Sequence, residues 1–369
     1  MKKIKVIKLT RAELSGMEDE WAQCLEGSDA NPLFSSWIWQ KSWWDIWQPR
    51  LSLDLLLLGI YQGNTLIGIA PCYTYDVKRL GFVTTKRCEF IGNFSHNDDS
   101  IRSEYLNFIL PKGRYDELLP VILKYIQTQQ VDEVVLTDMD SRSSTVDYLT
   151  KNYPSCEKTQ EAGVCINTNK QFITYLSSLG KNTRLKLFNR RKLLNNPKLI
   201  TITQSDEIRL FFEDLNKMHL SRWGKVCFSS HSEKFHQIIS EYFLKQECLE
   251  LLVLLEDNTP LAVCYDIKVE NTQYNIQLGF TEYPNNKVSL GTLMLGYSIE
   301  KAHEAPQIEN YDLLAGNGKN TFYKQHFQGE SHVFITLSIP LTFKVECLYF
   351  LKATYRKLKA LLIKKPLFK

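Results

Sequence analysis

The chain has 369 residues, which is enough for two domains of ordinary size, each with its own core. A composition of 44% hydrophobic and 23% charged residues is typical of a globular protein and excludes a disordered one. Nine scattered cysteines contain no CxxC pair, so we expect no disulfide framework, no metal site and a reducing cytosol. Residues 341–369 hold eight Lys or Arg against one Glu, so the net charge of +4 leaves the remainder slightly acidic. A basic nucleic-acid-binding surface on the body is therefore not expected.

The N-terminal stretch MKKIKVIKLT is basic, but no apolar segment follows it, so we expect no signal peptide. The longest apolar run, Leu53–Ile60, has the length of a strand and is too short to cross a bilayer. A cytoplasmic protein is the expectation.

Residues 31–47, NPLFSSWIWQKSWWDIW, contain five of the seven tryptophans. Trp37, Trp44 and Trp47 fall at helical spacing, and Ser36 is a suitable N-cap. The simplest interpretation is a core helix against the first sheet, with a stacking platform for a sugar or base as the alternative.

Two parts of the chain share the same order of elements: a hairpin, a further strand, a helix and a closing strand. The first set is Leu55–Tyr73, Glu104–Leu110, Tyr115–Gln129 and Asp132–Met139. The second set is Leu251–Ile267, Thr272–Phe280, Thr292–Glu304 and Asn310–Gly316. Chance is one explanation, since hairpins are common, but the shared order favours a duplicated α/β unit with a mixed sheet.

Between these halves, the segment Gly180–Lys198 has seven basic residues and no acidic one. Its apolar residues do not form one clean helical stripe. It is either a helix packed on two sides, with arginines reaching a phosphate-bearing ligand, or a solvated basic linker helix.

The loop TEYPNNKVSLG delivers Ser289, Leu290 and Gly291 to the start of a helix near Thr292. Free backbone N–H groups and the positive end of the helix dipole make such a start suitable for a pyrophosphate. An ordinary N-cap is the simpler alternative.

The stretch YDLLAGNGKNTFYKQHF places Asp312 inside a strand-like run and then breaks the run at Gly316 and Gly318. We expect the break to splay the strand end and a short helix to follow. Tyr323 on that helix could protonate a departing thiolate, because the two pKa values are close. Lys324 could hold an anionic group or simply cover the surface.

In NKMHLSRWGKVCF, His219 and Arg222 lie three residues apart on one helical face, with Trp223 beside them. A lone histidine is usually structural, but a His-x-x-Arg-Trp cluster beside a cleft is a candidate for substrate contact.

These motifs together resemble the branch of the GNAT superfamily typified by the cellulose-biosynthesis protein CelD, which is related to FemAB-type transferases. The matching segments run up to about Ile339: FSSWIWQKSWW, LIGIAPCY with EFIGN, RLKLFNRRKLL, HLSRW, LGF with SLGTLML, and the YDLLAG stretch. The order and spacing of these segments, more than any single one, carry the resemblance.

The resemblance implies an α/β fold of two tandem GNAT-like units, each a mixed, mostly antiparallel sheet flanked by helices. The implied domains are 1–165 and 166–340, followed by a basic C-terminal helix at 341–369. It further implies an N-acyltransferase that takes acetyl-CoA or another acyl-CoA as co-substrate.

The GNAT pyrophosphate loop usually reads Gln/Arg-x-x-Gly-x-Gly/Ala, whereas the corresponding residues here are NKVSLG, without the basic lead and the first glycine. The expected donor contacts are Lys287, Ser289, Leu290, Gly291 and Thr292. The first unit has no comparable loop, so we expect donor binding only in the second.

The implied mechanism is direct transfer to an amine without an acyl-enzyme, with Tyr323 as the acid. Either Asp312 or His219 would take the amine proton, and Arg222, Trp223 and Lys324 would contact the acceptor. The expected acceptor is an amino sugar or another polysaccharide or cell-envelope precursor. One alternative is a FemAB-like aminoacyl transferase that uses aminoacyl-tRNA. A second alternative is a non-catalytic polysaccharide-assembly factor on the same scaffold.

The C-terminal segment places Leu348, Leu351, Tyr355, Leu358 and Leu362 along one helical stripe with basic residues opposite. Such a helix either docks on its own protein or makes peripheral contact with an anionic membrane, which would be the inner face of the cell membrane.

Overall fold

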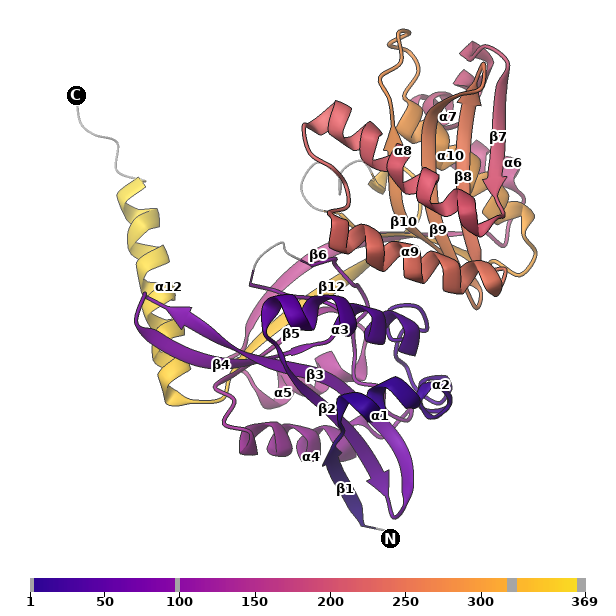
Figure 1. Ribbon diagram of the computed structural model, residues 1–369. Coiled ribbons are helices and arrows are strands. Elements are labelled where there is room, and N and C mark those ends of the chain that lie inside the picture. The colour runs from indigo at the N-terminus through magenta and orange to yellow at the C-terminus, as the bar shows by residue number, and fades with distance from the viewer. Residues whose placement is uncertain (1–2, 97–99, 317–323, 364–369) are drawn as a thin grey trace, which may run out of the picture. The chain divides into compact units, whose positions relative to one another are not determined.

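The computed structural model describes residues 3–96, 100–316 and 324–363, with side chains up to residue 355 (Figure 1). The described chain forms two compact units. Unit 1 contains residues 1–31, 48–159 and 335–369, and unit 2 contains residues 32–47 and 160–334. Each unit is therefore assembled from separate stretches of the chain, whereas the sequence predicted contiguous domains that meet at residue 165.

The sheet of unit 1 has the strand order β1-β2-β3-β4-β5-β12. Its neighbours from β1 to β4 are antiparallel, and β4 and β5 are parallel. The strands are β1 (Ile4–Lys8), β2 (Asp54–Gln62), β3 (Thr65–Arg79), β4 (Val83–Phe90), β5 (Glu133–Asp140) and β12 (Glu330–Pro340). The helices of this part of the chain are α1 (Arg11–Gly16), α2 (Glu18–Glu26), α4 (Tyr115–Thr128), α5 (Ser144–Asn152) and α12 (Phe343–Ile363).

The sheet of unit 2 has the order β6-β11-β10-β9-β8-β7 and is antiparallel except between β10 and β11. The strands are β6 (Glu157–Asn167), β7 (Pro197–Ile202), β8 (Leu249–Glu256), β9 (Thr259–Val269), β10 (Thr272–Phe280) and β11 (Asn310–Gly316). Its helices are α3 (Trp37–Leu51, up to Trp47), α6 (Phe172–Ser178), α7 (Lys181–Leu187), the 3-10 helix η1 (Asn189–Leu193), α8 (Ser205–Trp223), α9 (Ser230–Lys245) and α10 (Leu290–Glu304). The predicted fold class, two α/β units with mixed, mostly antiparallel sheets, is confirmed.

The last strand of each sheet comes from the other half of the chain. Strand β6 follows α5 of the first half, but from Gln160 onward it lies in unit 2, where it pairs with β11. Strand β12 follows β11, but from Ile335 onward it lies in unit 1, next to β5. The duplicated units have therefore exchanged their sixth strands.

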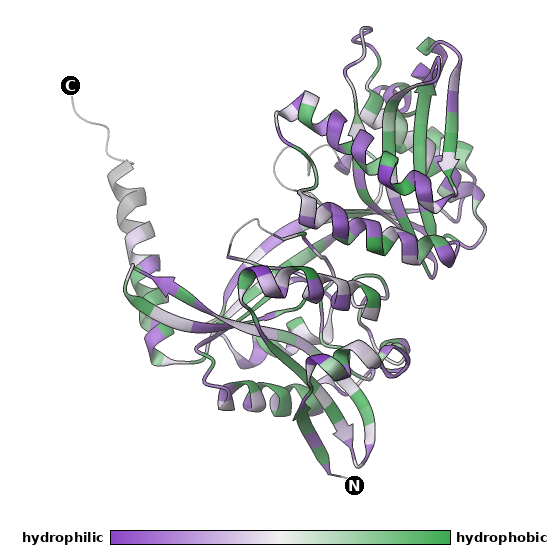
Figure 2. Cartoon of the chain, in the orientation of Figure 1, coloured by the Kyte–Doolittle hydropathy of each residue, from purple (hydrophilic) through white to green (hydrophobic). Residues whose placement is uncertain are grey.

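The two predicted hairpins are present as β2–β3 and β8–β9. Most residues of β8 and β9 are hydrophobic (Figure 2). This composition fits strands that are buried on both faces, and six of the eight residues of β8 are buried. The predicted helices at 115–129 and 292–304 and the closing strands at 132–139 and 310–316 are also confirmed within two residues.

The strand predicted at Glu104–Leu110 is wrong. The segment makes only one isolated bridge, Ile109 to Ile69, and the third strand of unit 1 is instead β4. Tyr105 has a φ of +56°, which a strand cannot accommodate. Buried polar side chains such as Asn107 hold this segment in place through side-chain contacts, including one from Thr145 Oγ1 at 2.6 Å.

The aromatic helix α3 begins as predicted, since Ser36 Oγ accepts from the backbone N–H of Trp39 at 3.4 Å. The prediction that it packs on the first sheet is wrong, because its residues up to Trp47 belong to unit 2. Trp39 and Trp47 lie against Phe235 of α9, with ring centroids 5.0 and 5.4 Å away. These rings are fully buried, so α3 is a core helix of the second unit.

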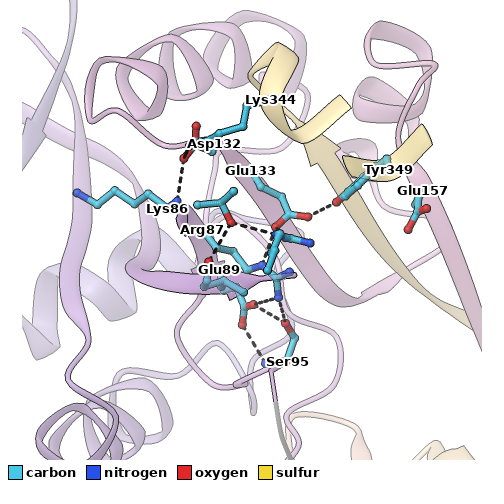
Figure 3. Close-up of polar contacts among 12 residues, drawn as sticks. Lys86, Arg87, Glu89, Ser95, Asp132, Glu133, Glu157, Lys344 and Tyr349 are labelled. Atoms are coloured by element: carbon cyan, nitrogen blue, oxygen red, sulfur yellow. Dashed lines mark hydrogen bonds and ion pairs between the residues drawn. The ribbon is translucent and has the colours of Figure 1, made fainter. Parts of the chain in front are cut away.

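Helix α12 docks on unit 1 through one side of its first two turns (Figure 3). Val345 and Tyr349 are buried, Tyr349 donates to Glu133, and Lys344 Nζ lies 2.9 Å from Asp132 Oδ2. Among the residues that the structure describes, no helix is both long and apolar enough to cross a membrane.

Candidate functional site

The parallel strands β10 and β11 separate soon after they meet. They pair only from Thr272–Asn310 to Tyr274–Asp312, although β10 continues to Phe280 and β11 to Gly316. At the same point β10 bulges against β9: Asn275 faces Asp266 and Gln277 faces Tyr265, which leaves Ile276 as an extra residue. A bulge bends its strand, so β10 turns away from β11 where the pairing stops. The splayed strand end predicted from the sequence is present.

A buried carboxylate ties the strands together just before they separate. Asp266 on β9 accepts hydrogen bonds from Gln273 Nε2 at 2.8 Å, Asn275 Nδ2 at 2.7 Å and Tyr311 Oη at 3.0 Å. Ser298 of α10 donates to the same side chain. Burial raises the pKa of Asp266 above its usual value, and these donors act in the opposite direction. The cluster joins β9, β10, β11 and α10, so it fixes where the splay begins.

Asp312, the aspartate inside the strand, has a structural task. Its Oδ1 accepts from the backbone N–H of Leu314 at 2.7 Å, and Leu314 has a φ of +58°. The pairing of β11 with β6 shifts there, from Asp312–Cys165 to Ala315–Gly163. The carboxylate therefore supports the irregular backbone at the end of β11, as Asx turns do.

Asp312 also has a buried histidine beside it, which the sequence did not single out. His332 Nε2 lies 3.8 Å from Asp312 Oδ1, and both side chains are buried. A Cβ on Gly163 would lie 2.2 Å from His332 Nε2, so only a glycine on β6 leaves room for this imidazole. A carboxylate next to an imidazole can pass a proton, provided that a water or substrate reaches the pair. A histidine in a strand-like run is too common to identify this pair from sequence.

The predicted acid Tyr323 and the second glycine, Gly318, lie outside the described residues, so the role of Tyr323 stays a prediction. Lys324 is described, and its ammonium donates to the backbone oxygens of three β11 residues: Leu313, Leu314 and Ala315. This lysine therefore holds the end of β11, and its contact with an acceptor stays a prediction.

The helix expected to face an anion, α10, follows β10 after the loop of residues 281–289. Phe280 packs on the first turn so closely that a Cβ on Gly291 would lie 2.5 Å from the phenyl ring. Among the described residues, Ser289 makes no capping bond to the first-turn N–H groups, and its Oγ lies instead 3.0 Å from Thr292 Oγ1. The first turn of α10, which lies at the splayed end of β10, thus has no side-chain cap from Ser289. Lys287, two residues before Ser289, is exposed in the preceding loop.

The structure brings the predicted His219, Arg222 and Trp223 to the same end of β10. His219 Nε2 donates to the backbone oxygen of Leu278 at 2.9 Å, and its ring lies 4.4 Å from that of Trp223. The guanidinium carbon of Arg222 lies 4.5 Å from the centre of the Phe280 ring. Arg222 and the first turn of α10 therefore share Phe280 as a neighbour.

Two protonation states at this end of β10 follow from burial. Burial lowers the pKa of His219 below its ordinary value near 6.5, so the imidazole is neutral at neutral pH. Cys227 accepts from Gln277 Nε2 at 2.6 Å, and burial raises the pKa of its thiol to about 12. The Cys227 thiol is therefore a poor nucleophile.

The basic segment between the halves packs against α10. It folds as α7 and η1, and the close approach of the Leu187 backbone oxygen to Gly296 leaves no space for a Cβ there. Arg191 pairs with Glu300, and its guanidinium carbon lies 3.7 Å from the centre of the Tyr297 ring. Arg190 donates to the backbone oxygen of Lys287 in the loop before α10. The interpretation as a segment packed on its neighbours is confirmed, and the contact of its arginines with a phosphate stays a prediction.

Comparison with known proteins agrees with this geometry. Residues 181–325 match the family model described as an acetyltransferase (GNAT) domain, and no curated protein matches the chain. The crystal structure of FemX is similar at 10% identity over 93% of this chain and 99% of that chain, with a TM-score of 0.60. A conserved protein of unknown function from Bacteroides thetaiotaomicron is similar at 10% identity over 92% and 100%, with a TM-score of 0.55.

The structure of L-PGS from Bacillus licheniformis is also similar, at 8% identity over 92% of this chain and 96% of that chain, with a TM-score of 0.51. Similarity at such low identity shows a shared fold only, so the chemistry has to be argued from the residues of the site. Residues 181–325, which include the splayed β10–β11 pair, are thus similar to a GNAT acetyltransferase domain.

Proposed function

We propose that this protein is an N-acyltransferase that transfers an acyl group, most simply acetyl, from acyl-CoA to an amine. The observation that carries the proposal is the separation of β10 from β11 after three residue pairs, with the end of β10 packed on the first turn of α10. The backbone groups of β10 beyond Tyr274 are no longer used by β11, so a pantetheine arm can bond to them as an added strand would. The first turn of α10 is then positioned for the pyrophosphate at the other end of the same donor.

Arg222 offers a cation to this donor. The loop before α10 lacks the basic residue that begins the usual GNAT pattern, and the exposed Lys287 offers only one charge there. The Arg222 guanidinium lies on the Phe280 ring, which in turn packs on Gly291 in the first turn of α10. We infer that Arg222, together with Lys287, neutralises the pyrophosphate, while Ser289, Leu290, Gly291 and Thr292 contribute backbone or hydroxyl donors.

The proposed reaction is a direct transfer. The nitrogen of a neutral amine attacks the thioester carbonyl, a C–N bond forms, the C–S bond breaks, and the sulfur leaves as a thiol after Tyr323 donates its proton. Backbone N–H groups of β10 polarise the carbonyl oxygen. The surplus amine proton goes to His219, which is neutral at neutral pH, or to Asp312 with His332 as the intermediate carrier. A cysteine nucleophile is not needed, in keeping with the raised pKa of Cys227.

The acceptor that we propose is an amino sugar or another precursor of a polysaccharide or the cell envelope. The support for it is the resemblance of the sequence motifs to the CelD branch. Trp223, which is half exposed beside His219, provides a ring on which a sugar could stack.

The second candidate is an aminoacyl transfer of the FemAB kind, with aminoacyl-tRNA as donor. It is favoured by the similarity to FemX over nearly the whole chain and by the basic segment next to α10. The non-catalytic assembly factor is the third candidate, and it requires that neither donor bind.

Isothermal titration of the full chain with acetyl-CoA separates the three. Micromolar binding that Arg222→Ala weakens about tenfold supports the acyltransferase. Binding of aminoacyl-tRNA without binding of acetyl-CoA would replace it with the second candidate. If neither ligand binds, the assembly factor remains and the acyltransferase is wrong.

A further inference from the structure

Large apolar side chains of unit 1 are exposed on two neighbouring elements. At the tip of the β3–β4 hairpin, Leu80 is 67% and Phe82 is 82% exposed. On α12, Phe343 is 78% and Phe350 is 71% exposed. Single exposed apolar residues are normal, but a contiguous group of aromatic and aliphatic ones marks an interaction surface.

The hairpin tip lies beside the start of α12. Lys344 Nζ donates to the backbone oxygen of Thr84 at 3.1 Å, and Thr84 pairs with Lys78 one step from the turn. The backbone N–H of Phe82 closes that turn on Arg79 at 3.2 Å. The hairpin and the start of α12 are therefore neighbours, although about 260 positions separate them in the chain (Figure 1).

The exposed face of α12 is fixed by the contacts on its other side. Val345 and Tyr349 face unit 1, where Tyr349 donates to Glu133 (Figure 3). With 3.6 residues per turn, Phe343 and Phe350 lie on the opposite side of the helix. The helix cannot rotate to cover them without removing Tyr349 from its buried partner. Two residues of the apolar stripe predicted for this helix, Leu351 and Tyr355, are also exposed.

Basic residues flank these apolar residues in the sequence. Residues 77–88 of the hairpin hold four Lys or Arg and no acidic residue, and residues 341–369 hold eight against one Glu. Arg79 and Arg87 are engaged with Glu133, whereas Lys78 is exposed beside the tip. Phenyl and leucyl groups in basic segments of the chain complement the acyl boundary and the phosphates of an anionic bilayer. A nucleic acid would complement the charges but not the exposed aliphatic side chains.

We propose that these residues form one docking surface, the hairpin–helix surface, for a bilayer that contains anionic lipid. Its members are Leu80, Phe82, Phe343, Phe350, Leu351 and Tyr355. Two elements inserted together bind more strongly than either alone, because the second insertion follows without a new loss of translational freedom. The surface belongs to unit 1, so the proposal does not depend on the chemistry proposed for unit 2.

The test is co-sedimentation of the full chain with vesicles of phosphatidylcholine alone or with 30% phosphatidylglycerol. We expect binding to the anionic vesicles, about tenfold weaker binding for Phe82→Asp or Phe350→Asp, and little binding for the double variant. Leu210→Asp, at an exposed leucine of α8, is the matched control and should bind as the wild type does. Raised salt should weaken the binding.

Several outcomes would overturn the proposal. Equal binding to both kinds of vesicle removes the role of charge, and unchanged binding of the double variant removes the role of the surface. If transfer RNA binds in place of vesicles and Phe82→Asp weakens it, the partner is a nucleic acid. If the variants instead turn a dimer into a monomer, the surface binds a second copy. An unchanged circular-dichroism spectrum and melting temperature of each variant show that it is folded, and this control does not depend on the proposed reaction.

Discussion

The parallel strand pairs of the two units begin alike and end differently. In unit 1, β4 and β5 pair over three residues, from Arg87–Glu133 to Glu89–Val135, as many as β10 and β11 do in unit 2. In unit 1, however, β4 ends at Phe90, and the loop that follows returns a side chain to β5. Asn93 Nδ2 donates to Thr137 Oγ1 at 2.9 Å and to Asp138 Oδ2 at 3.0 Å. In unit 2, β10 continues six residues beyond its last pair and bends away at Ile276.

The charged groups at the two parallel pairs differ in the same way. In unit 1, Glu89 and Glu133 are buried with Arg87 between them, and Tyr75 Oη and the backbone N–H of Ser95 donate to Glu89 (Figure 3). These contacts fill the end of the pair with ion pairs. In unit 2, the buried Asp266 accepts from Gln273 and Tyr311, which lie just before the point where β10 and β11 separate. Side-chain contacts thus cover the end of the parallel pair in unit 1, whereas in unit 2 the two strands diverge beyond their third pair.

The largest effect that we expect is on the chemical step in unit 2. Tyr323→Phe should lower kcat about 100-fold, because general acid catalysis typically contributes at least this much. The dissociation constant for acetyl-CoA should not change. Stopped-flow or steady-state release of the thiol, together with calorimetric titration, measures both quantities. An unchanged kcat would show that Tyr323 is not the acid.

The next effect concerns the closed end of unit 1. Asn93→Ala should lower the free energy of unfolding by about 2 kcal/mol, because it removes the buried hydrogen bonds that Asn93 donates to Thr137 and to the backbone oxygen of Ser103, and the one that it accepts from the Ser103 N–H. Urea unfolding measures the loss, with Asn152→Ala at the exposed end of α5 as the control. Acetyl-CoA affinity should stay the same. A weaker affinity would mean that unit 1 takes part in donor binding, which contradicts the comparison.

His219→Gln should lower kcat about tenfold and alter the pH profile. Folding favours the neutral imidazole of His219, so its pKa is lower in the folded state than in the unfolded state. As the pH falls through this lowered pKa, the imidazole becomes protonated. The activity and the stability that the neutral imidazole contributes are then lost. The wild-type profile should therefore have an acid limb with its midpoint below pH 6.5, and the variant should lack it. His231→Gln on α9 serves as the control. An acid limb that persists in H219Q assigns the base to Asp312 with His332.

The smallest effect that we expect is from Gly291→Ala. Its new methyl group would lie 2.5 Å from the Phe280 ring, so the ring and the first turn of α10 must shift apart. Acetyl-CoA affinity should fall roughly fivefold, which corresponds to about 1 kcal/mol. Gly16→Ala in α1, where no atom lies within 4 Å, should leave the affinity unchanged. An unaltered affinity in G291A would separate α10 from the donor.

The sequence predicts the parts of this fold that depend on local pattern. Hairpins with turn residues between apolar runs, the amphipathic α4 and the cap at Ser36 are all local features, and all are present. The exchange of β6 and β12 and the membership of α3 in unit 2 depend on which surfaces meet in the folded chain. No periodicity carries that information.

The residues of the candidate site also differ in whether the sequence alone predicts them. The splay of β11, the start of α10 and the His219–Arg222–Trp223 group can be found in the sequence because each is a short motif. The carboxylate of Asp266 and the pair Asp312–His332 cannot, because their partners come from separate strands and from α10. Strand β4 was missed because its residues VTTKRCEF do not alternate cleanly: both faces carry polar groups that are satisfied inside unit 1.

The reciprocal position of β6 and β12 limits how this protein can be divided. A cut between the halves would leave each fragment with a strand that completes the other fragment's sheet, and with an unpaired edge of its own. Separate halves would thus be prone to aggregate, whereas the two fragments mixed together would be able to restore both sheets.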